Sequence, residues 1–286
     1  MEAQPRVLDA FERWAHVPLR LAGYRSTYVP TSVGRIHALR VDGKGRGPTV
    51  VLLHGFSAAA IHYVPLMRRL RRSASQILAL DLPAHGLSDS PPSGADAIAL
   101  RQGMLEALDA LLPDPAVLFG NSMGGFAALQ YALHRPEKLR GLVLCSPAGA
   151  MMSEEELADF LASFKIETHA QALDFTDRLL RPGNPMRRPV AWGIRRKFSD
   201  PAMTGLLTSL RSEDLVTPEQ LANLQPKTLM VWGKRDFILP STHREFYRTH
   251  LPEHVEWSEP VDYSHSPYLE NLDQVTFQLL DFLRRV

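Results

Sequence analysis

The chain has 286 residues, 45% of them hydrophobic and 22% charged, which is the composition of a folded globular protein rather than of a disordered one. A formal net charge of +1 excludes a strong overall attraction to nucleic acid or to an anionic membrane. The single cysteine, Cys145, excludes an intrachain disulfide and a zinc site built from several cysteines. It lies in an apolar run and is expected to be buried. A cytoplasmic enzyme or binding protein fits these numbers.

The N-terminal residues 1–23 have the apolar spacing of an amphipathic helix and lack the apolar core of a secretory signal. We expect a helical arm that packs on the surface of the domain, with a membrane-surface contact or a dimer interface as alternatives. No apolar run approaches the roughly 20 residues that a membrane-spanning helix needs.

Strands and helices alternate along the rest of the chain. Residues 24–31 and 36–41 predict an antiparallel hairpin, because a glycine-containing turn separates two short strands. The expected buried strands are residues 49–53, 77–80, 116–119, 142–145 and 228–232, with a last strand near 255–257. The expected helices are 98–112, 123–134 and 271–285. This order predicts a mostly parallel sheet with helices on both faces, whose ligands bind beyond the carboxyl ends of the strands.

Residues 151–224 break that alternation. They contain amphipathic helical pieces separated by prolines and no clear buried strand. We expect them to form a helical insertion over the carboxyl edge of the sheet. The core would then consist of residues 1–150 and 225–286.

The strongest local motif is Gly120-Asn121-Ser122-Met123-Gly124, a G-x-S-x-G sequence between a predicted strand and a predicted helix. A tight turn there would project the serine hydroxyl into a site, and it requires very small residues two positions before and after the serine. Ser122 is therefore the expected nucleophile. The alternative is a glycine turn with an incidental serine.

A serine needs a base and an orienting acid. His265 lies in a polar loop between the last predicted strand and the last helix, and Asp236 follows the strand at 228–232. The order Ser122, Asp236, His265 is the one expected for this arrangement. The alternatives are that either side chain only caps a neighbouring helix.

The backbone N–H groups of Phe56 and Met123 are the expected oxyanion donors, because they follow the first buried strand and the serine respectively. Ser57 and Phe237 are the expected substrate contacts. His54 is expected to tie loops together, and Asp81 is expected to hold the shape of the loop that it begins.

These motifs, in this order, resemble those of the α/β-hydrolase superfamily from about Gly34 onward. One departure is Ala84, which stands where the family's D-x-x-G-x-G-x-S motif has its first glycine. The resemblance implies an α/β fold with an eight-stranded, mostly parallel sheet, with the hairpin as its first two strands. It also implies a helical cap between strands six and seven. Family members that use aspartate as nucleophile, the haloalkane dehalogenases and epoxide hydrolases, do not fit Ser122.

The expected reaction is hydrolysis of a small-molecule carboxylic ester through an acyl-enzyme, with no metal and no organic cofactor. The elbow is also similar to that of meta-cleavage-product C–C hydrolases. Those enzymes usually have a tryptophan where this chain has Leu269 and a glycine-rich oxyanion loop, so C–C cleavage is the second alternative. A non-catalytic small-molecule binder is the third.

One charged cluster lies in the insertion: Arg181, Arg187, Arg188, Arg195, Arg196 and Lys197. The plain interpretation is a solvated face balanced by the acidic residues Glu154, Glu155, Glu156 and Asp159. The alternative is a docking surface for an acidic carrier or an acidic substrate, similar to esterases that act on carrier-bound methyl esters. No nucleic-acid partner is expected.

Overall fold

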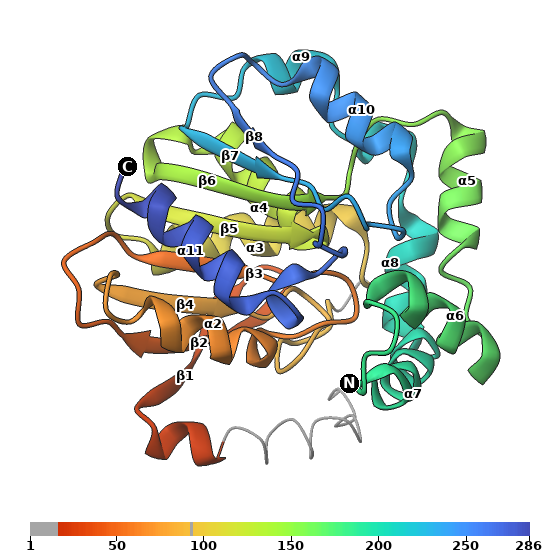
Figure 1. Cartoon of the computed structure of the whole chain (residues 1–286), viewed down its shortest axis with the longest axis horizontal. Helices are drawn as coiled ribbons and strands as arrows, with labels where there is room; N and C mark the ends of the chain where they lie inside the picture. Colours follow the sequence, from red (N-terminus) through yellow and green to blue (C-terminus); the bar gives the residue numbers. More distant parts are fainter. Residues whose placement is uncertain (1–16, 92–93) are drawn as a thin grey trace.

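A computed structural model describes residues 17–91 and 94–286 and shows one eight-stranded sheet with helices on both faces (Figure 1). The expected N-terminal arm lies largely outside these residues, apart from a helical turn at 17–21. Within the described residues, no helix combines the length and the apolar character that crossing a membrane requires.

The strand order in the sheet is β1-β2-β4-β3-β5-β6-β7-β8. The strands β1 and β2 form the predicted hairpin, β2 also runs antiparallel to β4, and every later pair is parallel. Their bounds are β1 Tyr24–Thr31, β2 Gly34–Asp42, β3 Val50–Leu53, β4 Gln76–Leu80, β5 Ala116–Ser122, β6 Leu139–Pro147, β7 Thr228–Val231 and β8 Glu256–Ser258. The predicted α/β fold with an eight-stranded, mostly parallel sheet is confirmed.

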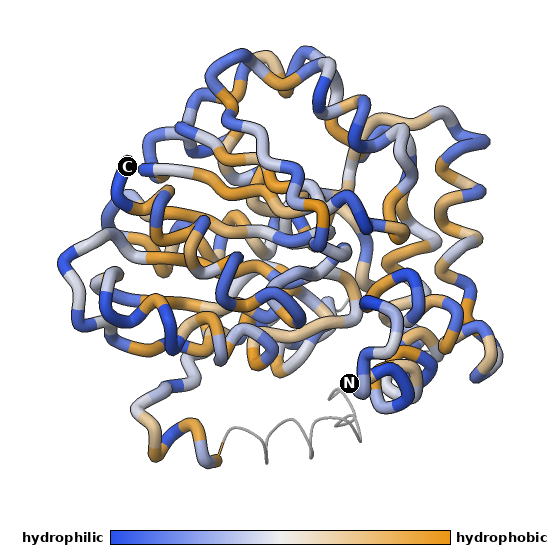
Figure 2. The backbone as a smooth tube through the Cα atoms, viewed as in Figure 1, coloured by the Kyte–Doolittle hydropathy of each residue, from blue (hydrophilic) through white to orange (hydrophobic). Residues whose placement is uncertain are grey.

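Two helical layers bury the sheet. The helices α2 (Val64–Leu70) and α11 (Leu272–Leu283) share one apolar cluster with one face. The helices α3 (Ala97–Leu111), α4 (Met123–His134) and α10 (Ser241–His250) cover the other face. Because both faces are covered, β3 and β5 consist entirely of buried residues, and β3 and residues 116–119 of β5 are continuous apolar runs in the sequence. In Figure 2 the hydrophobic colour gathers along these central strands.

Between β6 and β7 the chain carries the helices of the expected insertion, residues 151–224, and they lie beside the carboxyl ends of the strands (Figure 1). Its helices are α5 Glu154–Ala162, α6 His169–Leu179, α7 Arg187–Phe198, α8 Pro201–Ser209 and α9 Pro218–Ala222. Phe164, Phe175 and Phe198 form much of its own apolar cluster, and Phe56 from the sheet edge packs into that cluster. The rings of Phe56 and Phe198 are 5.1 Å apart. The insertion is thus fastened to the core at the expected oxyanion loop.

Candidate active site

The serine turn is strained. Ser122 ends β5, has φ 53° and ψ −120°, and is followed at once by α4. Residues other than glycine seldom adopt these backbone angles, and residues strained in this way are common at functional sites. A Cβ at Gly120 would lie 2.3 Å from the carbonyl oxygen of Gly124, and one at Gly124 would lie 2.2 Å from that of Leu53. Only glycine therefore fits two positions before and two positions after the serine.

His265 and Asp236 form a buried hydrogen-bonded pair. The Nδ1 atom of His265 lies 2.8 Å from Oδ2 of Asp236, and both side chains are almost wholly buried. The other carboxylate oxygen of Asp236 accepts hydrogen bonds from the backbone N–H groups of Ile238 and Leu239. Burial raises the pKa of Asp236, but the charge and hydrogen bond of His265 outweigh it, and the net pKa is below the ordinary value. The carboxylate is thus ionised and can orient the imidazole through Nδ1.

Asn121 joins the serine turn to the histidine loop. Its side-chain amide donates hydrogen bonds to the carbonyl oxygens of His265, at 2.8 Å, and Cys145, at 3.0 Å. Its oxygen accepts a hydrogen bond from the hydroxyl of Ser266 at 2.9 Å. Because Asn121 precedes Ser122 and Ser266 follows His265, these bonds bring together two segments that lie 144 residues apart in the chain.

The orientation of the Phe56 N–H is set by the preceding peptide. His54 Nδ1 lies 2.8 Å from the Gly55 carbonyl oxygen, and His54 Nε2 accepts a hydrogen bond from the N–H of Leu82. Nδ1 therefore carries the proton and donates. In a planar trans peptide the N–H points opposite to the C=O, so fixing the Gly55 carbonyl fixes the Phe56 N–H. A Cβ at Gly55 would lie 3.1 Å from Cβ of Ser122, so this peptide passes directly beside the serine.

Met123 is the first residue of α4, and its N–H is among those that have no partner within a helix. The N-terminal end of the helix carries partial positive charge, which favours an anion at this point. The N–H of Met123 thus follows Ser122 in the chain, and the N–H of Phe56 belongs to the loop that passes beside it.

Asp81 holds these loops together through its hydrogen bonds. Its carboxylate accepts hydrogen bonds from the N–H groups of Ala60 and Leu87 and pairs with Nδ1 of His37 at 2.7 Å. Burial raises the pKa of Asp81, but the His37 hydrogen bond and the neighbouring charges outweigh it, and the net pKa is well below the usual range. Gly86 lies so close that a Cβ there would collide with the carboxylate.

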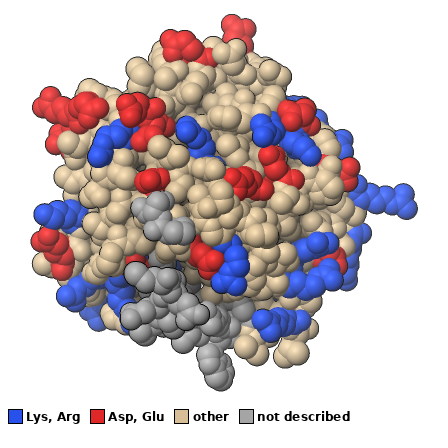
Figure 3. Space-filling view, turned by 180° about the vertical axis from the view of Figure 1, so that it is seen from behind, with Lys and Arg blue, Asp and Glu red and all other residues tan. Residues whose placement is uncertain are grey.

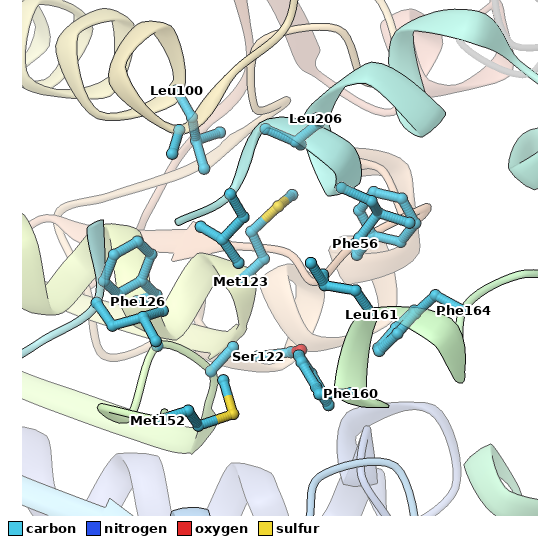
Figure 4. A pocket seen from close by; sticks show the side chains of 16 residues that line it. Phe56, Leu100, Ser122, Met123, Phe126, Met152, Phe160, Leu161, Phe164 and Leu206 are labelled. Carbon is cyan, nitrogen blue, oxygen red and sulfur yellow. The ribbon is translucent and has the colours of Figure 1, made fainter. Parts of the chain in front are cut away.

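An apolar cavity that is partly open to solvent lies at Ser122 (Figure 4). Ser122, Met123 and Phe56 line it, so the cavity brings together three of the predicted site residues. The helical insertion supplies most of the remaining wall: Met152, Phe160, Leu161, Phe164, Leu206, Leu207, Leu210 and Leu215. The arrangement combines the hydroxyl of Ser122 with an apolar cavity.

Two predicted substrate contacts lie elsewhere. Ser57 and Phe237 are not among the residues that line this cavity, and the side chain of Phe237 is 58% exposed. Their contact with substrate stays a prediction.

A family model described as alpha/beta hydrolase fold matches residues 48–272. The chain belongs to this family. Pimeloyl-acyl-carrier protein methyl ester esterase of Chromobacterium violaceum is 31% identical over 246 residues, which are 82% of this chain and 93% of that protein. The α/β-hydrolase described here is therefore an enzyme of the esterase type.

Solved structures of this fold are similar over nearly the whole chain. Naproxen esterase from Bacillus subtilis has a TM-score of 0.78 at 16% identity, covering 98% of this chain and 99% of that one. The 2-hydroxy-6-oxo-6-phenylhexa-2,4-dienoate hydrolase of Rhodococcus sp. strain RHA1 also has a TM-score of 0.78, at 23% identity, covering 91% and 99%. At such identities the likeness shows the fold alone.

Two features of this α/β-hydrolase site were not predicted from the sequence. Asn121 lies within the elbow motif, but an asparagine before the serine does not indicate which loop it will bind. The lining residues of the insertion appear in the sequence as ordinary apolar helix positions. Their one signal is that Phe164 follows Leu161 by three positions and Phe160 by four, the spacings that bring side chains together on a helix, although α5 itself ends at Ala162.

Proposed function

We propose that this α/β-hydrolase cleaves carboxylic esters with Ser122 as nucleophile, His265 as general base and acid, and Asp236 as the group that orients the histidine. The N–H groups of Phe56 and Met123 would hold the oxyanion. The helical insertion would act as a cap that encloses the apolar part of the substrate. No metal or organic cofactor enters the reaction.

In the first half of the reaction, Oγ of Ser122 attacks the ester carbonyl carbon while Nε2 of His265 takes the hydroxyl proton. Asp236 stabilises the resulting imidazolium, and the two N–H groups stabilise the negative charge on the carbonyl oxygen. Each such donor contributes about 3–4 kcal/mol to transition-state stabilisation. When the C–O bond breaks, the leaving alcohol takes the proton from His265.

In the second half, water attacks the acyl-enzyme and gives its proton to His265. The second tetrahedral intermediate then releases the carboxylic acid, and Ser122 regains its proton from His265. Water is the only co-reactant, and the enzyme returns to its starting protonation state.

The observation that carries the proposal is the place of Ser122. Its hydroxyl belongs to a strained turn and lines an apolar cavity. Asn121 joins that turn by hydrogen bonds to the loop of the His265–Asp236 pair. The cavity walls are apolar, so we propose esters with an apolar acyl or alcohol part rather than short polar ones.

A panel of p-nitrophenyl esters from acetate to dodecanoate, beside a dienoic C–C substrate, tests this function. We expect kcat/KM to rise with chain length until the cavity is filled, and Ser122→Ala to lower kcat by about 10⁶-fold. Faster turnover of the dienoic substrate than of every ester would replace the proposal by C–C cleavage. Binding of ligands without turnover of any substrate would point to a non-catalytic binder.

The basic cluster of the insertion supports a finer proposal, an acyl group delivered by an acidic carrier. Within the cluster, Arg187 pairs with Asp177, and Arg181 contacts Glu270. Arg188, Arg195 and Arg196 remain exposed along α7, and Arg196 stacks on the exposed ring of Trp192. On the face shown in Figure 3, both signs of charge occur side by side. The relative from Chromobacterium violaceum is named for a carrier-bound methyl ester.

Salt dependence separates the carrier proposal from a solvated basic face. With an acidic carrier-bound methyl ester, kcat/KM should fall steeply between low and physiological salt, and a neutral p-nitrophenyl ester should show little change. The variant Arg188→Ala/Arg195→Ala should flatten the first response. An equal salt response of both substrates would exclude the docking surface.

A further inference from the structure

Glu270 is a buried carboxylate outside the proposed triad. Its side chain is only 1% exposed, although it lies in the same loop as His265. A carboxylate in such a position needs hydrogen-bond donors to compensate for lost hydration. Glu270 has them from two different parts of the fold.

The donors on one side come from the helical insertion. The backbone N–H of Arg181 lies 3.0 and 3.1 Å from the two carboxylate oxygens, and the side-chain amide of Asn184 lies 2.6 Å from one of them. The oxygen of that amide accepts a hydrogen bond from the N–H of Met186, which fixes the amide so that its NH₂ group faces Glu270. The guanidinium of Arg181 adds a contact at 3.7 Å.

The donor on the other side belongs to the histidine loop. The hydroxyl of Ser264, the residue before His265, donates to Glu270 at 2.8 Å. One carboxylate thus joins the segment between α6 and α7 to the chain that leads directly into His265. The distance along the sequence is 86 residues from Asn184 and 89 from Arg181.

We propose that Glu270 is a positioning residue that latches the helical insertion to the loop of His265, so that closure over the apolar cavity and alignment of the imidazole occur together. The proposal rests on the function proposed above for Ser122 and His265. The insertion supplies most of the cavity wall, so an apolar substrate bound there contacts it. Opening the insertion would separate Arg181 and Asn184 from Glu270 and leave the loop that leads into His265 without its anchor on the insertion, so His265 would be fully aligned only after closure.

A double-mutant cycle tests the coupling. Asn184→Ala removes a donor on the insertion side only, and Glu270→Gln replaces an acceptor oxygen by an NH₂ group that would face the same donors. We expect each change to lower kcat/KM about 10-fold, and the double variant to be no worse than Glu270→Gln alone, because both break one latch. Glu106→Gln is the matched control, since Glu106 of α3 accepts hydrogen bonds from the N–H and hydroxyl of Ser32 in the turn between β1 and β2.

The chain-length profile distinguishes a latch from a local effect. A change confined to the histidine loop would lower kcat equally for acetate and for long-chain esters. A change confined to the insertion would affect the long chains only. The latch predicts both in Asn184→Ala: a lower kcat for acetate and a smaller preference for long chains.

Hydrogen exchange gives a readout that does not need activity. Peptides covering 178–188 and 262–272 should both exchange faster in Asn184→Ala and in Glu270→Gln, while Glu106→Gln should leave both unchanged. This arm would still report on the latch if the wild-type enzyme cleaved no ester, so failure of the proposed function is distinguishable. Wild-type exchange at 262–272 in Asn184→Ala, or multiplicative effects in the cycle, would overturn the proposal.

Discussion

At the scale of single residues, the turn at Ser122 depends on the absence of side chains around it. Gly120 and Gly124 stand where any Cβ would strike backbone oxygen atoms at 2.2–2.3 Å. Backbone cannot move aside as the end of a side chain can. The unusual φ of Ser122 is therefore held by its neighbours rather than by its own side chain.

Gly124→Ala tests this dependence. The new Cβ would meet the carbonyl oxygen of Leu53 and displace α4 from β3, so we expect a loss of about 2–4 kcal/mol in the free energy of unfolding and a large loss of kcat. Urea denaturation and ester kinetics measure the two effects. Gly193→Ala in α7 is the control, because nothing lies within 4 Å of a Cβ there, and it should stabilise the helix by up to about 1 kcal/mol. Equal stability of the two variants would contradict the account.

At the scale of elements, the sequence predicts the strands well and the contacts between loops poorly. The apolar runs at 49–53, 77–80 and 228–232 match β3, β4 and β7 closely, because strands buried on both faces leave few polar positions. The short α2 was not predicted, since seven residues give too few turns for a periodic pattern.

In the candidate site, too, the sequence indicates residues in motifs but not the contacts between loops. Ser122, Asp236 and His265 could be proposed from the sequence because each follows a strand or lies in a motif. The bonds of Asn121 to the histidine loop and of Glu270 to the insertion connect segments 86 to 145 residues apart, and no local pattern encodes which loops will meet. Such partners become visible only once the strand order is known.

The insertion helices determine the size of the apolar cavity, so filling the cavity from α5 should change substrate preference. We expect Leu161→Trp to lower kcat/KM for octanoate at least 10-fold and to change that for acetate by about twofold or less, because only the long chain reaches this wall. Leu21→Trp, at a residue that is 91% exposed, is the matched control. If Leu161→Trp slowed both esters equally, the cavity would not be the acyl site.

At the scale of the whole molecule, buried histidines make stability depend on pH. His243 of α10 is 1% exposed and packs against the ring of Phe160 in α5. Neither ring nitrogen has a hydrogen-bond partner among the described residues. Burial lowers the pKa of His243 to about 4, and the charges of Asp236 and Glu156 offset this only in part. Burial lowers the pKa of His54 to about 4 as well.

The sign of the effect follows from proton counts. Between about pH 6.5 and pH 4 the unfolded chain binds protons at these histidines and the folded chain does not, so the free energy of unfolding falls as the pH falls. Each histidine contributes a slope of up to about 1.4 kcal/mol per pH unit in this window. His243→Leu should therefore flatten the decline and leave the stability at pH 4 above that of the wild type. Urea midpoints between pH 4 and 7 measure this, and an unchanged slope would show that His243 is protonated in the fold.

The central claim is that Ser122 is made reactive by His265. Intact-protein mass spectrometry after treatment with a fluorophosphonate tests it most directly, because only an activated serine reacts readily. We expect a single adduct on the wild-type chain, located at Ser122, none on Ser122→Ala, and labelling at least about 10³-fold slower on His265→Ala. An adduct on Ser122→Ala, or equally fast labelling of His265→Ala, would contradict the account.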